Sequence, residues 1–99
     1  MAFKVAFRPH AAADLDQIDD FIAKDSPQRA AAFVQRIRQH CESLQDMPES
    51  GPSRGDLGRG VRILPFERRA VIAYRIVGTG VEILRIFYAG RDYDAESFD

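Results

Sequence analysis

The chain has 99 residues, enough for one hydrophobic core but not for two, so we expect a single domain over residues 1–99. Hydrophobic residues make up 45% and charged residues 29% with a net charge of −1, and no apolar run approaches the roughly 20 residues that a membrane span needs. The single cysteine, Cys41, excludes an internal disulfide and suits a reducing, cytoplasmic compartment.

The N-terminal part of the chain predicts a strand followed by a helix. Residues 3–8 alternate apolar and polar side chains, and Pro9 ends the strand because proline cannot donate to a ladder. Residues 9–24 predict a helix whose apolar face is formed by Ala11, Leu15, Ile18 and Ile22. The aspartates of this helix, Asp14 included, have the spacing of a solvated face rather than that of a metal or acid–base cluster.

A second helix is expected from Pro27 to about Asp46, after a natural cap at Ser26. Its apolar face is formed by Ala30, Phe33, Ile37, Cys41 and Leu44. Because the joint is short, the two helices should form an antiparallel hairpin, and each is too short to be stable without a sheet to pack on. Cys41 on this face is predicted to be a small core residue rather than a reactive thiol.

The C-terminal half predicts three strands. Proline and glycine recur over residues 47–60, which predicts the long loop, and strands are expected at residues 61–64, 69–77 and 81–89. Gly78-Thr79-Gly80 separates the last two strands and indicates a hairpin. The sequence therefore predicts an α+β fold of order β-α-α-β-β-β, with a helical hairpin and a three-stranded antiparallel meander, and a loose acidic tail over residues 92–99.

Arginine recurs inside all three of these strands, at Arg62, Arg75 and Arg85. Side-chain parity places Arg75 and Arg85 on one face of the sheet, with Arg85 beside Val81, Ile83 and Phe87. The residues predicted to lie under the helices are Ile72, Tyr74, Ile76, Leu84 and Ile86. Residues 54–91 hold eight arginines against three carboxylates, which suits nucleic acid or an acidic peptide as a partner. The alternative is that these arginines pair with Glu67 and Glu82.

The residues give little sign of catalysis. The chain has no glycine-rich phosphate loop, nucleophile elbow or HExxH motif, and His10 and His40 have no visible partner in sequence. We therefore expect no metal and no other cofactor. A ribonuclease would need a base and an acid around a phosphate. Arg62, Arg85 and Arg91 offer charge and Tyr88 or Tyr93 a proton donor, but no residue is placed as the base.

Several local patterns together resemble ParE-type toxins of bacterial toxin–antitoxin systems, in the RelE/ParE superfamily. They lie at residues 13–23, 25–27, 47–51, 60–65 and 83–92, so the resemblance covers residues 3–92. It implies a RelE/ParE-like fold and a cytoplasmic toxin that binds no membrane. It also implies that a cognate ParD-like antitoxin with a ribbon-helix-helix part holds the toxin inactive. Operator DNA would be contacted only through the antitoxin.

The resemblance leaves three functions open. ParE-type toxins are associated with inhibition of DNA gyrase by protein–protein binding, which is the preferred interpretation. RelE-type relatives cleave mRNA on the ribosome, and often carry histidine where this chain has Tyr88. An inactive member would bind only its antitoxin. The expected target-binding residues are Arg62, Arg75, Arg85, Tyr88, Arg91 and Tyr93. The expected antitoxin-binding residues, in the groove between the helical hairpin and the sheet, are Leu15, Ile18, Ile22, Phe33, Ile37 and Arg69.

Overall fold

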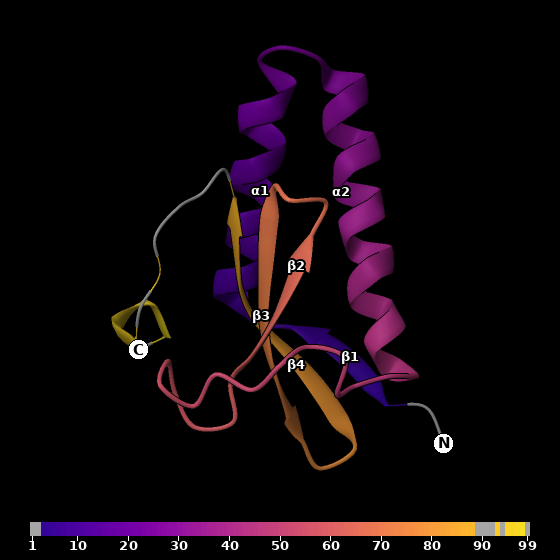
Figure 1. Cartoon of the computed structure of the whole chain (residues 1–99). Coiled ribbons are helices and arrows are strands. Elements are labelled where there is room, and N and C mark those ends of the chain that lie inside the picture. The colour runs from indigo at the N-terminus through magenta and orange to yellow at the C-terminus, as the bar shows by residue number, and fades with distance from the viewer. Residues whose placement is uncertain (1–2, 89–92, 94, 99) are drawn as a thin grey trace.

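The computed structural model describes residues 3–88, 93 and 95–98. The main elements follow the predicted order: β1 (Lys4–Phe7), α1 (Pro9–Ala23), α2 (Pro27–Glu42), β2 (Arg62–Phe66), β3 (Ala70–Val77) and β4 (Gly80–Tyr88). Short 3-10 turns form η1 (Ser43–Gln45) and η2 (Ala95–Phe98). The predicted α+β fold is confirmed, and the two helices stand side by side against one face of the sheet (Figure 1).

The sheet has the strand order β1-β4-β3-β2. The last three strands form the predicted antiparallel meander, whereas β1 runs parallel to β4, so the sheet is mixed. The helical hairpin follows β1 and covers the sheet, and β1 itself becomes an edge strand beside β4, the last strand of the meander. This topology brings residues from the two ends of the chain next to each other on β1 and β4.

The helix boundaries follow local chemistry. The side chain of Ser26 accepts a hydrogen bond from the backbone N–H of Arg29 (3.2 Å), and Pro27 occupies the first helical position, as the sequence predicts. The α-helix ends at Glu42 rather than at the predicted Asp46, because the chain tightens into η1. Such 3-10 turns are frequent at helix C-termini, where the last carbonyls lack partners.

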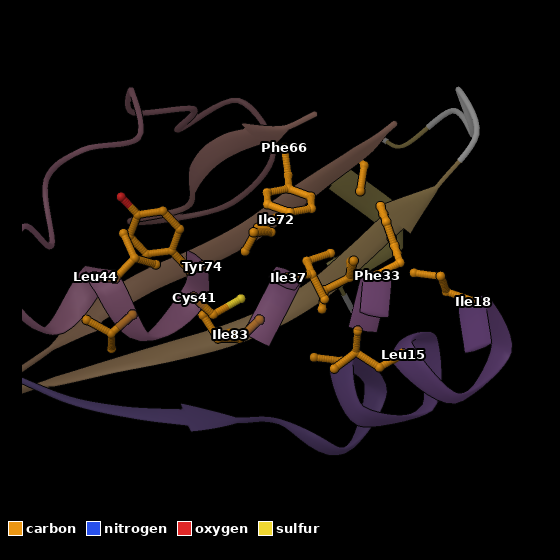
Figure 2. Packing of buried hydrophobic residues seen from close by; sticks show 14 residues of the cluster. Leu15, Ile18, Phe33, Ile37, Cys41, Leu44, Phe66, Ile72, Tyr74 and Ile83 are labelled. Carbon is orange, nitrogen blue, oxygen red and sulfur yellow. The ribbon is translucent and has the colours of Figure 1, made fainter. Parts of the chain in front are cut away.

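The main core lies between the helices and the sheet. Figure 2 shows Leu15 and Ile18 of α1 and Phe33, Ile37 and Cys41 of α2 facing Ile72, Tyr74 and Ile83 of the sheet. These side chains are at most 5% exposed. Cys41 is fully buried and therefore takes the core position predicted for it, and burial raises the pKa of its thiol to about 12. The hairpin and the sheet thus stabilise each other, since neither could bury this surface alone.

A bulge in β4 changes which side chains face the helices. Ala73 pairs with Arg85 while Tyr74 pairs with Ile83, so Leu84 is an extra residue in the ladder. Ile83 therefore packs in the main core, and Leu84 packs on the opposite face. The predictions that Leu84 lies under the helices and that Arg85 shares a face with Val81 and Ile83 are wrong for this reason. The predictions for Ile72, Tyr74 and Ile86 are confirmed; Ile76 is only half-buried.

The face of the sheet away from the helices carries a second, smaller cluster. Its buried members are Leu57, Val61, Ile63, Ala73 and Phe87. Tyr93 stacks on the ring of Phe87 at 4.9 Å between centroids, and Phe98 meets the same ring edge-on at 5.9 Å. In the segment for which a loose tail is predicted, the described residues 93 and 95–98 contact Phe87 through Tyr93 and Phe98 and form η2. Among the described residues, no helix has the length and apolar character that crossing a bilayer requires.

The tight turn between β2 and β3 has an unusual backbone. Glu67 and Arg68 at its centre have φ of 50° and 58°, and the N–H of Arg69 donates to the carbonyl of Phe66 (3.0 Å). Two consecutive positive φ angles define the type I′ hairpin turn, whose twist matches that of the flanking strands. Glycine and asparagine usually occupy these positions. The backbone of Glu67 and Arg68 is therefore held in a φ/ψ region that is strained for residues with larger side chains.

Candidate functional site

A buried ion pair joins α1 to β4. The guanidinium of Arg85 donates to both carboxylate oxygens of Asp14, at 2.7 and 3.0 Å, and the two side chains are only 15% and 5% exposed. The hydrogen bond to Asp14 raises the pKa of Arg85. Arg85 also donates to the backbone carbonyl of Ser97 (2.9 Å) and lies over the ring of Phe87. This guanidinium is therefore fixed in place, and it ties η2 to the sheet.

Asp14 also completes the edge of β4. β1 ends at Phe7, opposite Ile83, and the last backbone bond to that edge comes from the N–H of Arg8. Beyond this point the N–H of Ile86 donates to the Asp14 carboxylate (2.9 Å), so a helix side chain replaces the missing strand. The prediction that all the aspartates of this helix are solvated is wrong for Asp14, whose role depends on residues about 70 positions away.

The predicted target-binding residues fall on two faces. Arg75 stands opposite Glu82 in the ladder and donates to it (3.0 Å), on the same face as Arg85 and Tyr93. Arg62 stands opposite the core residue Tyr74, so its side chain leaves the sheet on the helix side.

The other residues predicted to bind the target do not lie with Arg75 on the face away from the helices, as far as the structure describes them. The guanidinium of Arg62 donates to the carbonyl of Gly51 (2.9 Å) in the long loop. Tyr88 packs on the helix side against the rings of Phe21 and Phe33, at 5.9 and 5.5 Å. Arg91 lies outside the described residues. Arg75, Arg85 and Tyr93 therefore share the face away from the helices, and Arg62 and Tyr88 lie on the helix side.

A groove lies between the α1–α2 turn and the nearby ends of β3 and β4. One hollow of about 660 Å³ is lined by Phe21, Ile22, Lys24, Asp25, Arg29, Phe33, Arg36, Arg69 and Tyr88. A smaller hollow of about 230 Å³ shares Phe21 and Tyr88 with it and continues to Gln17 and Asp14. We call the two hollows together the hairpin groove. Its centre is aromatic and its rim is mainly cationic.

The predicted antitoxin-binding residues meet this groove in part. Ile22, Phe33 and Arg69 line the larger hollow and Ile18 the smaller one. Leu15 and Ile37 are buried in the core and do not line the groove. Sequence reasoning missed Phe21, which is 60% exposed although it is large and apolar. The available signal was an aromatic residue placed off the apolar stripe of α1, next to a run of aspartates.

The charges around the hairpin groove are partly paired. Arg36 of α2 binds Glu67 of the β2–β3 turn through two hydrogen bonds, at 2.8 and 3.0 Å, and this contact lowers the pKa of Glu67 and raises that of Arg36. Among the described residues, no carboxylate lies within ion-pair distance of Arg29 or Arg69. The rim therefore offers guanidinium groups to a partner that carries carboxylates.

The described residues contain no group of three or more histidine, cysteine, aspartate or glutamate side chains that could hold a metal ion. Comparison with known proteins gives a match over nearly the whole chain. Residues 5–93 match the family model described as the ParE toxin of the type II toxin–antitoxin system parDE.

The chain belongs to the ParE toxin family. Toxin RelE1 of Caulobacter vibrioides is 30% identical over 89 residues, which are 89% of this chain and 95% of that toxin. A chain of the chromosomal ParDE system from P. aeruginosa superposes with a TM-score of 0.76 and 32% identity, over 89% of this chain and 97% of that one. The toxin–antitoxin complex RelBE2 from Mycobacterium tuberculosis matches with a TM-score of 0.62 and 25% identity, over 89% and 99%.

Membership of the ParE family makes this protein a type II toxin of the RelE/ParE superfamily. The family match includes β1, both helices and the whole meander, so it extends over both faces of the sheet. The hairpin groove and the arginine-bearing face of this toxin are therefore both parts of the family fold rather than additions to it.

Proposed function

We propose that this toxin is a single domain that acts in the cytoplasm by binding DNA gyrase and inhibiting it without catalysis. A cognate ParD-like ribbon-helix-helix antitoxin would neutralise it, and operator DNA would be contacted only through that antitoxin. Membership of the ParE family supports the proposal. The chromosomal ParDE match from P. aeruginosa supports it as well.

The observation that favours protein binding over mRNA cleavage is that Arg62 and Arg85, which the sequence offered as charge for a ribonuclease, do not meet. A ribonuclease must gather its cations around one scissile phosphate. Arg62 and Arg85 leave the sheet on opposite faces, and Arg85 is occupied by Asp14 and the Ser97 carbonyl. Tyr88, an expected proton donor, lies on the helix side among aromatic rings. These residues therefore stabilise the fold or lie on different surfaces, and they do not form one catalytic centre.

We place the gyrase contact on the face that carries Arg75 and Tyr93. The side chain of Arg75 is 42% exposed while it bonds Glu82, so part of its guanidinium remains open to a partner. Tyr93 is half-buried against Phe87 and offers a flat aromatic surface. Arginine and tyrosine are enriched among residues that dominate binding energy in protein interfaces.

We place the antitoxin in the hairpin groove. Phe21 is exposed there beside Tyr88, and burial of an exposed aromatic residue is a main source of binding energy. Arg29 and Arg69 on the rim would pair with carboxylates of the same partner. An amphipathic acidic segment satisfies both requirements, since its apolar side chains reach the centre while its charges meet the rim.

The test is a gyrase supercoiling assay with increasing toxin, scored also for trapped DNA breaks. We expect inhibition that the antitoxin reverses. Two arginine variants serve as reciprocal controls, because each removes one positive charge from a different face. Arg75→Ala should lose gyrase inhibition and keep antitoxin binding, whereas Arg29→Ala should keep inhibition and bind the antitoxin more weakly.

A folded toxin that arrests growth but leaves gyrase untouched would refute the gyrase proposal. The matches to toxin RelE1 and RelBE2 would then direct the search to mRNA cleavage on the ribosome. Cleavage that survives Arg62→Ala, Arg85→Ala and Arg91→Ala would exclude the arginines expected to supply charge to a ribonuclease. Absence of both growth arrest and inhibition would identify an inactive member that binds only an antitoxin.

A further inference from the structure

A second cavity lies on the face of the sheet away from the helices, at the start of α1. Its volume is about 440 Å³, and four arginines and a histidine line it: Arg8, Arg59, Arg75, Arg85 and His10. We call it the arginine pocket. Arg8, Arg59 and His10 are not among the target-binding residues expected from the sequence, because they come from the junction between β1 and α1, the long loop and α1 itself. The fold brings them to one place.

Paired carboxylates hold three of these arginines in position. Glu82 accepts a hydrogen bond from Arg75 at 3.0 Å, and its second oxygen lies 3.7 Å from the guanidinium of Arg8. Arg85 is held by Asp14 in the same way. Two carboxylates thus orient three guanidinium groups, which lowers the entropy cost of binding a ligand with them.

Among the described residues, the arginine pocket has an excess of positive charge. Four guanidinium groups line it, and the carboxylates in this part of the chain that pair with them are Glu82 and Asp14. Arg59 is exposed, and neither it nor His10 makes a hydrogen bond or ion pair with any described residue. Pro9 and His10 are the first residues of α1, so the positive end of a 15-residue helix faces the same space. All of these features favour a bound anion.

The rest of the pocket is apolar. Leu57, Val61, Leu84 and Phe98 complete its lining. Leu84 is available here because the β4 bulge turns it away from the helices. An inorganic anion would make no favourable contact with this apolar surface. A flat organic group attached to the anion would bury it. Stacking of a base on an aromatic ring contributes about 1–3 kcal/mol in single-strand binding proteins.

We propose that the arginine pocket binds a nucleotide unit. Arg59 and Arg75 hold its phosphate beside the N-terminus of α1, and its base lies against Phe98 and Leu84. Guanidinium groups bind phosphate oxygens bidentately, and the cavity has the size of small-ligand sites, roughly 300–1,000 Å³. The unit comes either from a free mononucleotide or from a single-stranded nucleic acid. This binding requires no catalysis, and it goes beyond the gyrase proposal although both involve Arg75.

The test is calorimetric titration of the purified full-length chain, without gyrase or antitoxin. The probes are 5′-AMP, adenosine, inorganic phosphate and a hexadeoxyadenylate that lacks terminal phosphates. We expect 5′-AMP to bind more tightly than adenosine or phosphate alone, since only 5′-AMP uses both parts of the pocket. Tighter binding of the hexamer than of 5′-AMP would identify a strand as the source, and the reverse would identify a free nucleotide.

Two matched variants locate the site. Arg59→Ala removes an exposed guanidinium from the arginine pocket, and Arg29→Ala removes one from the hairpin groove. We expect Arg59→Ala to weaken binding about tenfold, as loss of a charge-assisted hydrogen bond does. Arg29→Ala should change binding less than about twofold. Equal losses in the two variants, equal binding of adenosine and 5′-AMP, or no saturable binding would overturn the proposal. None of these outcomes bears on gyrase inhibition.

Discussion

Removal of the Asp14 carboxylate should destabilise the toxin more than the loss of any other aspartate of α1. Asp14→Ala deletes three hydrogen bonds, two from Arg85 and one from the N–H of Ile86. Loss of one partner of a buried ion pair costs about 3–5 kcal/mol, because the other charge stays buried without a counter-ion. A buried N–H left without an acceptor costs about 1–3 kcal/mol.

These two costs overlap, because Arg85 keeps its bond to the Ser97 carbonyl and is 15% exposed. We therefore expect Asp14→Ala to lower the free energy of unfolding by about 4 kcal/mol, a large part of the about 5–15 kcal/mol available to a small domain. Asp14→Asn should lose less, because its amide oxygen can still accept from Ile86. Urea unfolding followed by circular dichroism measures both changes.

The matched control is Asp16→Ala, which removes an exposed carboxylate from the same helix and should change stability by less than about 0.5 kcal/mol. The double variant Asp14→Leu with Arg85→Met should recover much of the loss, because it removes both charges together. A cost for Asp14→Ala no larger than that for Asp16→Ala would refute the reasoning. It would mean that water reaches this pair and already solvates it.

Three further changes test other parts of the fold. Tyr74→Phe should cost about 1–3 kcal/mol in urea unfolding, because its hydroxyl donates to the Pro48 carbonyl and accepts from the buried N–H of Gly51, both at 2.8 Å; unchanged stability would show that water replaces the hydroxyl. Arg68→Gly should raise the melting temperature by relieving its positive φ of 58°, with a gain of about 0.5–1 kcal/mol; a lower melting temperature would refute strain at this turn. Burial raises the pKa of Cys41 from 9.0 to about 12, so the stability it contributes is complete below pH 9 and is lost as the pH rises from 9 to 12. Alkaline unfolding of the wild type should therefore be steeper than that of Cys41→Ala, and a thiol reagent should label the native protein only as fast as it unfolds.

Much of the fold could be predicted because the pattern in each segment agrees with its place in the whole. The stripe from Leu15 to Ile22 and the cap at Ser26 depend on neighbours within one or two helical turns, and the structure places both as expected. The hairpin at Gly78 likewise follows from local backbone freedom, since this glycine has a φ of 59°.

The parts that could not be predicted depend on distant partners. Strand parity holds only while the ladder is regular, and nothing local marks Leu84 as the extra residue of a bulge. The burial of Asp14 requires β1 to end where it does, so that an N–H of β4 is left open beside the helix. The separation of Arg62 from Arg85 has the same origin, because pairing across strands decides which face each arginine takes.

The ion pair between α1 and β4 would couple any ligands that bind the two hollows beside it. Asp14 lines the smaller hollow of the hairpin groove, and Arg85 lines the arginine pocket on the other side of the sheet. A ligand in the groove that forms hydrogen bonds with the carboxylate of Asp14 would compete with Arg85 for it. The guanidinium of Arg85 could then reorient. Thermodynamic linkage then makes the coupling reciprocal, so that a ligand on either side changes the affinity of the other by the same factor. Two opposite surfaces are thus connected through one pair of side chains.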